Sequence, residues 1–243
     1  MDYFTLKKYI IEVYKYCNVQ SFPIDCFDLL KKYGYMVLTY DELKNISSEL
    51  YELCSSYSED AMSHKDYKIA AYNSSQPYTR IRFSLMHELA HIVVEKAIGR
   101  NLTEGEADFF ASNILAPRMA IHYSKCRNTS DVSRFFGMSK EAAEYAYENY
   151  ISWYKFIQRN NNRMTTLDRA MYYHFYDDTH KKFVYCRKEC RHCGQEFVNS
   201  EWRICEKCKR IAEIRGNMYD SNDADMKMLN KWIYNMSKKQ GIL

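Results

Sequence analysis

The segment from Tyr78 to Ile98 contains no proline or glycine, and its centre reads His-Glu-Leu-Ala-His at residues 87–91. Residues four apart lie on one face of a helix, so His87 and His91 can offer ring nitrogens to a single ion. Zinc takes neutral imidazole readily, and a catalytic zinc has three protein ligands and one position left for water. Glu88 can take the proton of that water. We therefore expect a helix that carries a catalytic zinc, and hydrolysis by a zinc-bound water with Glu88 as general base.

The same motif could also be a solvated helix face. Its surroundings argue against this, because they are apolar: Ile81, Phe83, Leu85, Met86, Leu89, Ile92, Val93 and Val94. Ionisable groups in such a helix need partners, which favours a metal site.

The third ligand must come from further along the chain. The pattern H-E-x-x-H-x-x-G-x-x-H fails, since Val94 stands in place of its glycine and Ala97 in place of its last histidine. Carboxylates are then the candidates. Glu95 lies one turn beyond His91 on the same helix, and a ligand nearly collinear with the two histidines suits tetrahedral geometry poorly.

A second helix is predicted to begin in the stretch from Glu104 to Pro117, with Thr103 as its N-cap. On that helix Glu106 shares a face with the apolar residues that would pack on the first helix, whereas Glu104 points roughly opposite. We therefore predict Glu106 as the third zinc ligand. The alternative is that Glu106 is only a first-turn acid favoured by the helix dipole.

Other segments suggest a small sheet among helices. Helical spacing is found in residues 1–18 and 26–33, and strands are expected at residues 35–40 and 68–73. Residues 41–66 are polar and irregular apart from a short helical candidate. The strand at 68–73 could supply an edge on which an extended peptide pairs, or it could be an interior strand.

Two joined motifs carry a resemblance. The succession Arg82-Phe-Ser-Leu-Met-His-Glu-Leu-Ala-His91, followed by Glu106-Ala-Asp108, Phe110-Ala111, Ile114-Leu115 and Pro117, resembles the ImmA/IrrE family of metallopeptidases. Phe22-Pro-Ile-Asp25, followed by a helix, Gly34 and a strand, is similar to that family's amino-terminal part. The resemblance covers roughly residues 5–150, and the joined motifs are more specific than H-E-x-x-H alone.

This resemblance implies a zincin-like zinc endopeptidase of a bacterium, phage or integrated element. The studied members cut a partner repressor that carries a helix-turn-helix, so that silenced genes are switched on. Carried over by position, His87, His91 and Glu106 would be ligands and Glu88 the general base. Asp108, where asparagine is commoner, and Met86, where alanine is usual, depart from the family pattern without touching the proposed ligands.

The carboxyl-terminal part has its own cysteine pattern. Cys190 and Cys193, then Cys205 and Cys208, form two C-x-x-C knuckles eleven residues apart, and each knuckle can aim two thiolates at one tetrahedral zinc. The pattern resembles a zinc ribbon, a domain too small to fold without metal. Cys186 and His192 lie close to the first knuckle and could each substitute for a ligand, but we do not expect them to bind the zinc.

Charge and cysteine usage limit the possible partners and the compartment. Residues 181–243 hold 14 Lys and Arg against 8 Asp and Glu, in a chain with a net charge of +4, so residues 1–180 carry about −2. Ribbons of this kind bind nucleic acid or protein or serve only to stabilise a fold, and the basic residues here favour a nucleic-acid partner such as DNA, or an acidic one. Residues 1–18 are too charged for a signal peptide, no segment is long and apolar enough for a membrane span, and nine mostly scattered or knuckle-forming cysteines suit reduced thiols. We expect a cytoplasmic protein.

We accordingly predict an α+β chain: a mostly helical zincin-like peptidase domain with a small sheet, then a four-cysteine zinc ribbon and a closing helix. The predicted boundaries are 1–122 for the peptidase domain, 123–180 for a helical extension and linker, 181–215 for the ribbon and 216–243 for the helix. Residues 224–238 are expected to form the amphipathic part of that last helix.

Two functions from different classes follow. The first is a zinc endopeptidase that cleaves a helix-turn-helix repressor and uses one catalytic and one structural zinc. The second is a non-catalytic, DNA-associated regulator with two structural zinc sites. An intact Glu88 and only three good ligands at the first site favour the enzyme, because a closed structural site would show a fourth cysteine or histidine.

Overall fold

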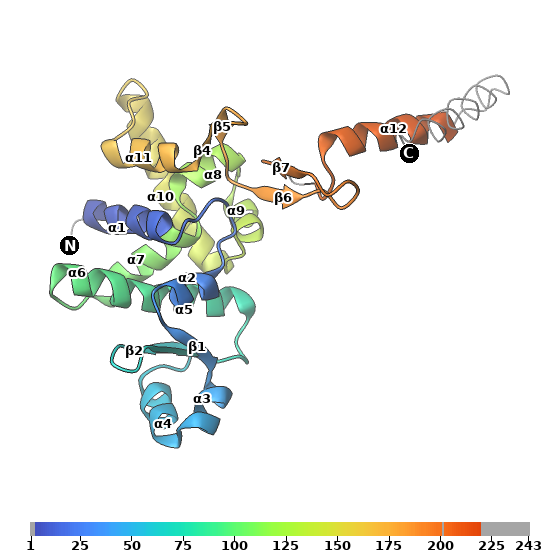
Figure 1. Ribbon diagram of the computed structural model, residues 1–243. Coiled ribbons are helices and arrows are strands. Elements are labelled where there is room, and N and C mark those ends of the chain that lie inside the picture. Colours follow the sequence, from blue (N-terminus) through green and yellow to red (C-terminus); the bar gives the residue numbers. More distant parts are fainter. Residues whose placement is uncertain (1–2, 201, 220–243) are drawn as a thin grey trace. The chain divides into compact units, whose positions relative to one another are not determined.

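Most of the chain is helical, as the sequence predicts, and three small sheets complete the α+β fold (Figure 1). The computed structural model describes residues 3–200 and 202–219. The chain divides into two compact units, Met1–Cys186 and Arg187–Leu243. The four-part division expected from the sequence is finer than these two units, and its inner boundaries remain predictions.

The main sheet has three strands, β1 (Met36–Thr39), β2 (Ala61–His64) and β3 (Ile69–Tyr72), in the order β1-β3-β2. β1 runs parallel to β3, and β2 runs antiparallel to it. The strand expected at residues 68–73 is therefore the interior strand. The edge strand β2 comes from the stretch that had been expected to be irregular.

Between β1 and β2 the chain forms two short helices, α3 (Tyr40–Ile46) and α4 (Ser48–Tyr57). Thr39 and Ser47 cap them through their side chains. A small separate core joins these helices to the sheet: Tyr40, Leu43, Cys54, Ile69 and Ala71.

The motif helix α5 (Tyr78–Ala90) lies between this sheet and the remaining helices of the first unit (Figure 1). It continues into a wider π-helical turn, η1 (His91–Glu95), and a last turn, α6 (Lys96–Ile98), which ends at Gly99 in a left-handed conformation. α2 (Cys26–Lys32) and α7 (Glu104–Leu115) both pack against α5, and α1 (Tyr3–Tyr16) packs against α7. The predicted N-cap at Thr103 is confirmed.

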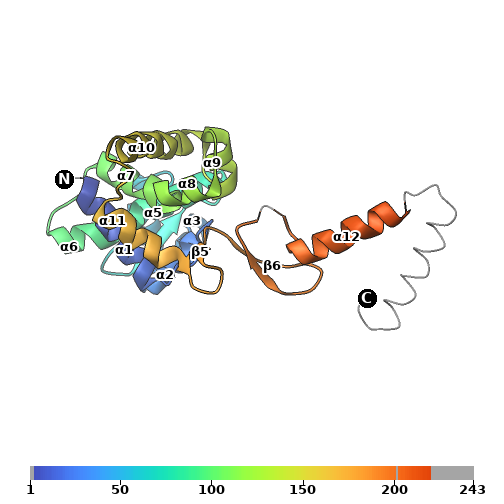
Figure 2. The same cartoon turned by 90° about the horizontal axis from the view of Figure 1, so that it is seen from above.

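Four further helices complete the first unit: α8 (Arg118–Ser124), α9 (Thr129–Phe136), α10 (Lys140–Arg159) and α11 (Thr166–Phe175). α10 lies beside α8 and α9 (Figure 2). A short hairpin, β4 (Tyr176–Asp177) and β5 (Lys182–Phe183), follows α11. Buried residues of these elements belong to the same core as α1, α5 and α7, and Phe183 in β5 is one of them.

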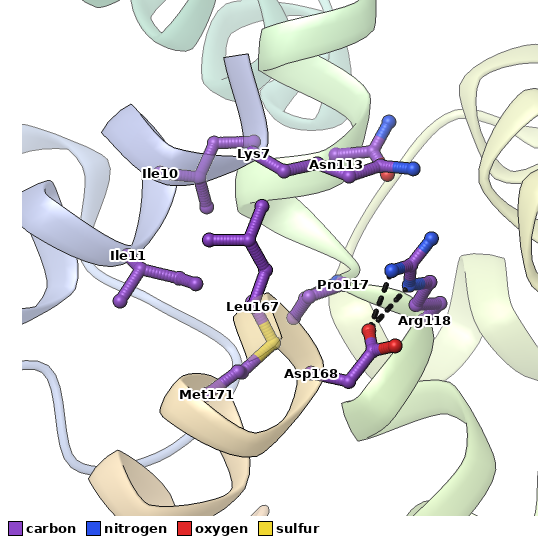
Figure 3. A pocket seen from close by; sticks show the side chains of 9 residues that line it. All are labelled: Lys7, Ile10, Ile11, Asn113, Pro117, Arg118, Leu167, Asp168 and Met171. Atoms are coloured by element: carbon purple, nitrogen blue, oxygen red, sulfur yellow. Dashed lines mark hydrogen bonds and ion pairs between the residues drawn. The ribbon is translucent and has the colours of Figure 1, made fainter. Parts of the chain in front are cut away.

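Asp168 on α11 ties three of these helices together. Its carboxylate accepts hydrogen bonds from Arg118 on α8, at 3.0 Å from Nε, and from Nε1 of Trp153 on α10, also at 3.0 Å. Thr165 adds its backbone N–H and its hydroxyl. A cavity of about 20 Å³ lies beside this ion pair, between α1, α7, α8 and α11 (Figure 3). That volume is enough for one water molecule.

The second unit contains a hairpin, β6 (Arg187–Glu189) and β7 (Glu196–Val198), and a helix, α12 (Glu206–Tyr219). The amphipathic helix expected at residues 224–238 lies outside the described residues. Among the described residues, no helix combines the length and the hydropathy that crossing a bilayer requires.

Candidate metal centres

The two motif histidines face each other with their Nε2 atoms. These atoms are 3.2 Å apart, and both rings are partly buried. The helix brings them together because His87 and His91 are four residues apart on one face, as predicted. The π-helical turn begins at His91, and such turns in α-helices are frequent at functional sites.

Carboxylates hold the outer nitrogens of both rings. Nδ1 of His87 lies 2.8 Å from Asp108 on α7, and Nδ1 of His91 lies 2.7 Å from Glu95. An ionised carboxylate only accepts hydrogen bonds, so each Nδ1 donates and each Nε2 keeps its lone pair for a metal. Burial alone would lower the pKa of His87, yet Asp108 and the neighbouring acids raise it overall. The surroundings therefore favour a positive charge at this point.

Glu95 is fixed by several groups besides His91. It accepts hydrogen bonds from Nζ of Lys65 at 2.6 Å and from the backbone N–H of Leu102 at 2.8 Å. Burial acts to raise its pKa, but these donors outweigh burial and lower the pKa of Glu95 to about 2. Glu95 therefore orients His91 as an ionised carboxylate, and it is not a third ligand.

The acid that lies beside the Nε2 atoms of the histidine pair is Glu104, the first residue of α7. Its carboxylate lies 3.3 Å from Nε2 of His87. One ligand atom each from His87, His91 and Glu104 lie within 4.8 Å of one another. The structure thus brings Glu104, and not the predicted Glu106, to the two histidines.

Glu106 is engaged elsewhere. Its carboxylate makes two hydrogen bonds with the Arg100 guanidinium, at 3.0 and 2.8 Å, and accepts the backbone N–H of Thr103 in the capping box that begins α7. The Arg100 contact, with the Thr103 N–H, holds the pKa of Glu106 far below its usual range. Glu106 is buried, as its place on the apolar face predicts, but its carboxylate turns back to close the cap. The alternative prediction from the sequence, a first-turn acid favoured by the helix dipole, is therefore closer to what the structure shows, and the capping box and Arg100 supply its contacts.

The correct acid did leave a signal in the sequence. Glu104 and Asp108 are four residues apart, so they share a face of α7, and both contact His87. The sequence prediction placed the third ligand on the apolar face of α7, because that face was expected to pack against the motif helix α5. Instead the metal-facing side of α7 is the polar edge beside that face.

Glu88, the expected general base, lies on the sheet side of α5. Its Oε2 accepts the backbone N–H of Ser63 at 2.8 Å and the Ser63 hydroxyl at 2.6 Å. Burial raises the pKa of Glu88 above its ordinary value. Ser63 was not identified from the sequence, because it comes from the unpredicted strand β2.

The two histidines, Glu88, Glu104 and Asp108 line one cleft of about 1290 Å³ in the first unit. Its walls include residues of β2, α5, α7 and α10, among them Ala61, Ser84, Asp108, Tyr145 and Asn149. Such a volume has room for several residues of an extended peptide beside the histidine pair.

The first site suits zinc by the chemistry of its donors. Two imidazole nitrogens with free lone pairs and one carboxylate are a three-ligand set, which leaves a coordination position toward the cleft. The nearby acids supply the negative charge that favours a bound cation.

A second group of donors lies in the other unit. The thiols of Cys190, Cys193, Cys205 and Cys208 lie within 4.8 Å of one another, as their spacing predicts. The first knuckle occupies the turn between β6 and β7, and the second lies at the start of α12. Cys186 and His192 are not part of this group among the described residues.

Hydrogen bonds already favour a thiolate in this cluster. The backbone N–H of Cys205 lies 3.2 Å from Sγ of Cys190, and with neighbouring N–H groups it lowers the pKa of Cys190 to about 6. The adjacent thiols raise the pKa of Cys208 to about 12. Four such thiols fit a tetrahedral zinc of a small ribbon.

A comparison with protein families agrees with the first site. Residues 34–148 match the family model Peptidase_M78, described as IrrE N-terminal-like domain. The match contains the sheet, the motif helix and α7 with its three acids, Glu104, Glu106 and Asp108. No curated protein matches the sequence. By this match, the domain at residues 34–148 belongs to the Peptidase_M78 family of metallopeptidase-type, zincin-like proteins.

Proposed function

We propose that this protein is a zinc-dependent endopeptidase that cuts a regulatory protein in the cytoplasm, with a helix-turn-helix repressor as its substrate. The observation that carries the proposal is the gathering of His87, His91 and Glu104 beside Glu88 in one large cleft. The resemblance to repressor-cleaving peptidases supports the choice of substrate. All nine cysteines are free thiols, which suits a reducing compartment.

His87, His91 and Glu104 would hold the zinc. This ligand set has Glu104 in the place of Glu106, the third ligand predicted from the sequence. Asp108 and Glu95 keep the two rings oriented with Nε2 toward the ion. A zinc ion held there would supply Lewis acidity, which activates water and polarises the scissile carbonyl.

Glu88 has the position and chemistry of a general base. Its carboxylate follows the first histidine in the helix and would take the proton of the attacking water, then return it to the leaving amine. The edge strand β2 lies along the same cleft, and the carbonyl groups on its outer edge would accept hydrogen bonds from the substrate backbone.

The basic second unit is proposed to contact DNA near the repressor. Trp202 is 59% exposed there, and Nζ of Lys209 lies 4.2 Å from the centre of its ring. The four cysteines would hold a second, structural zinc that keeps this unit folded.

The test uses the purified chain and a candidate helix-turn-helix repressor, chosen from the proteins encoded by the neighbouring genes. We expect the parent to cut the repressor, and Glu88→Gln to keep its zinc while cleavage slows about a hundred-fold or more. A Glu88→Gln variant that cuts at the parental rate would exclude Glu88 as the base.

Two acids on the same helix turn give a matched test of the ligand set. Glu104→Gln should lose the first zinc at a chelator concentration that leaves the parent loaded, whereas Glu106→Gln should keep it. Zinc content is measured by elemental analysis after dialysis against the chelator. The reverse result would restore Glu106 as the ligand.

A further inference from the structure

Ser63 makes the closest contact with the proposed base. Its hydroxyl and its backbone N–H both donate to one oxygen of Glu88, Oε2, at 2.6 and 2.8 Å. Both residues are buried, with exposed fractions of 7% for Ser63 and 8% for Glu88. Hydrogen bonds to an ionised carboxylate in a buried place are strong, so this pair fixes the side chain of Glu88.

The contact also uses a particular part of the edge strand. In an antiparallel pair, backbone groups point alternately toward the partner strand and away from it. Ser63 lies opposite Ala70 of β3 but gives its N–H to Glu88, so this N–H points away from β3. The N–H of Ala61, two residues earlier, likewise turns to the Ser58 hydroxyl at 3.3 Å. The base is thus held by the strand edge along which a substrate would lie.

The two oxygens of Glu88 are therefore not equivalent. Oε2 accepts both bonds from Ser63, while within the described part of the chain no hydrogen bond reaches Oε1. A general base must hold one oxygen in line with the proton that it takes, and a misplacement of about 1 Å can slow a reaction about a hundred-fold. The two hydrogen bonds from Ser63, here called the clamp, fix Oε2 and thereby leave Oε1 in a defined position.

We propose that Ser63 is a positioning residue, which holds Oε2 of Glu88 so that Oε1 is the oxygen that takes the proton. This inference rests on the proposed peptidase function. Ser63 acts through Glu88 alone, and it contributes neither to zinc binding nor to substrate affinity.

The test removes the hydroxyl while the backbone N–H stays. Ser63→Ala should lower kcat about ten-fold or more, with KM and zinc content unchanged, because half of the clamp is lost. Ser63→Thr keeps a hydroxyl on a side chain suited to a strand and should retain most of the activity. Ser56→Ala is the matched control, since it makes the same change at an exposed serine of α4 that does not line the cleft.

A double variant separates this inference from the proposed function. If Ser63 acts only through Glu88, then Ser63→Ala combined with Glu88→Gln should be no slower than Glu88→Gln alone. A crystal structure of Ser63→Ala should show the Glu88 carboxylate rotated or in two conformers, whether or not a substrate has been found.

Several results would overturn the positioning role. These are a parental kcat in Ser63→Ala, a loss of zinc or a raised KM in that variant, additive losses in the double variant, and an unmoved Glu88 carboxylate. A parent protein that binds zinc but cuts nothing would instead overturn the proposed function, and the Glu88 conformer in Ser63→Ala would still decide the role of Ser63.

Discussion

Single side chains decide the chemistry through their hydrogen-bond partners. Glu95, Asp108 and Glu106 are three acids close to one another in sequence or space, yet each has a different partner: His91, His87 and Arg100. A fourth acid, Glu104, faces the Nε2 atoms of the histidine pair, with its carboxylate 3.3 Å from Nε2 of His87. Partners, more than residue type, therefore separate a metal ligand from an orienting acid or a helix cap.

Asp168 offers a residue-scale prediction about stability. Burial acts to raise its pKa, but the Arg118 charge and the hydrogen bonds from Thr165 and Trp153 outweigh burial and lower it. A depressed pKa in the folded state contributes stability above the ordinary aspartate range, and this stability is lost as the pH falls through the folded value. Asp168→Asn leaves Arg118 uncompensated and should lower the free energy of unfolding at pH 7 by about 3 kcal/mol.

Urea unfolding at neutral and acidic pH checks this prediction. The difference in free energy of unfolding between the parent and Asp168→Asn should become smaller below about pH 4, where the aspartate of the unfolded chain is protonated. Glu12→Gln is the control, because the Lys8–Glu12 pair is exposed at 3.6 Å, and it should change little at either pH. A gap that stays constant with pH would contradict the role of the Asp168 charge.

At the scale of elements, helix ends place the site. α7 begins with the Thr103–Glu106 capping box, so Glu104 and Asp108 stand in its first turns beside His87. The wider turn η1 begins at His91, the last residue of the motif, and Glu95 at its end contacts the His91 ring. A shift of either helix along its axis would therefore separate the donors.

Two glycines at different helix positions should change the free energy of unfolding in opposite directions when each is replaced by alanine. Gly137 ends α9 with φ +64, a left-handed conformation that costs an L-residue about 1 kcal/mol or more. Gly105 lies inside the first turn of α7, and a Cβ there meets nothing within 4 Å. Gly137→Ala should lower, and Gly105→Ala raise, the free energy of unfolding by about 1 kcal/mol each.

Thermal and urea unfolding of the two variants measure these changes. The parent is the common reference, and both variants carry the same added methyl group. Equal losses in both would show that the position of the glycine in its helix does not decide the effect.

The whole molecule separates a proposed catalytic metal from a structural one. The first unit keeps every proposed catalytic group and ends at Cys186, after Phe183 in its core and a bond from the Val184 N–H to Phe175 at 2.7 Å. A cut before residue 181, at the boundary expected from the sequence, would remove part of this core. The informative truncation is therefore after Cys186.

We predict two zinc ions per full chain and one in residues 1–186. The shortened chain should still cut a high concentration of repressor, but it should lose salt-dependent DNA binding. Elemental analysis, cleavage assays and DNA titrations at two salt concentrations test this. A full chain with all four knuckle cysteines changed to serine is the control and should also hold one zinc. Two zinc ions in that variant would contradict the assignment of the second site.

The sequence by itself determined the features that depend on local backbone geometry. His87 and His91 face one ion because residues four apart share a helix face, and the cysteines converge because each C-x-x-C turn aims two thiols one way. The Thr103 cap followed from the same local rules. The distances between the two histidines and within each cysteine pair are set within one turn of chain, so spacing alone predicts them, whereas the two knuckles meet through the fold of the second unit.

Only the tertiary structure decided which more distant groups complete the site. The choice of Glu104 over Glu106 depends on how α7 is rotated against α5, and the Arg100 contact that occupies Glu106 comes from the loop before it. The clamp on Glu88 depends on β2 being the edge strand, which long-range pairing with β3 fixes. Helix rotation and strand order depend on many packing contacts between residues far apart in the chain, so they cannot be predicted from a short stretch of sequence.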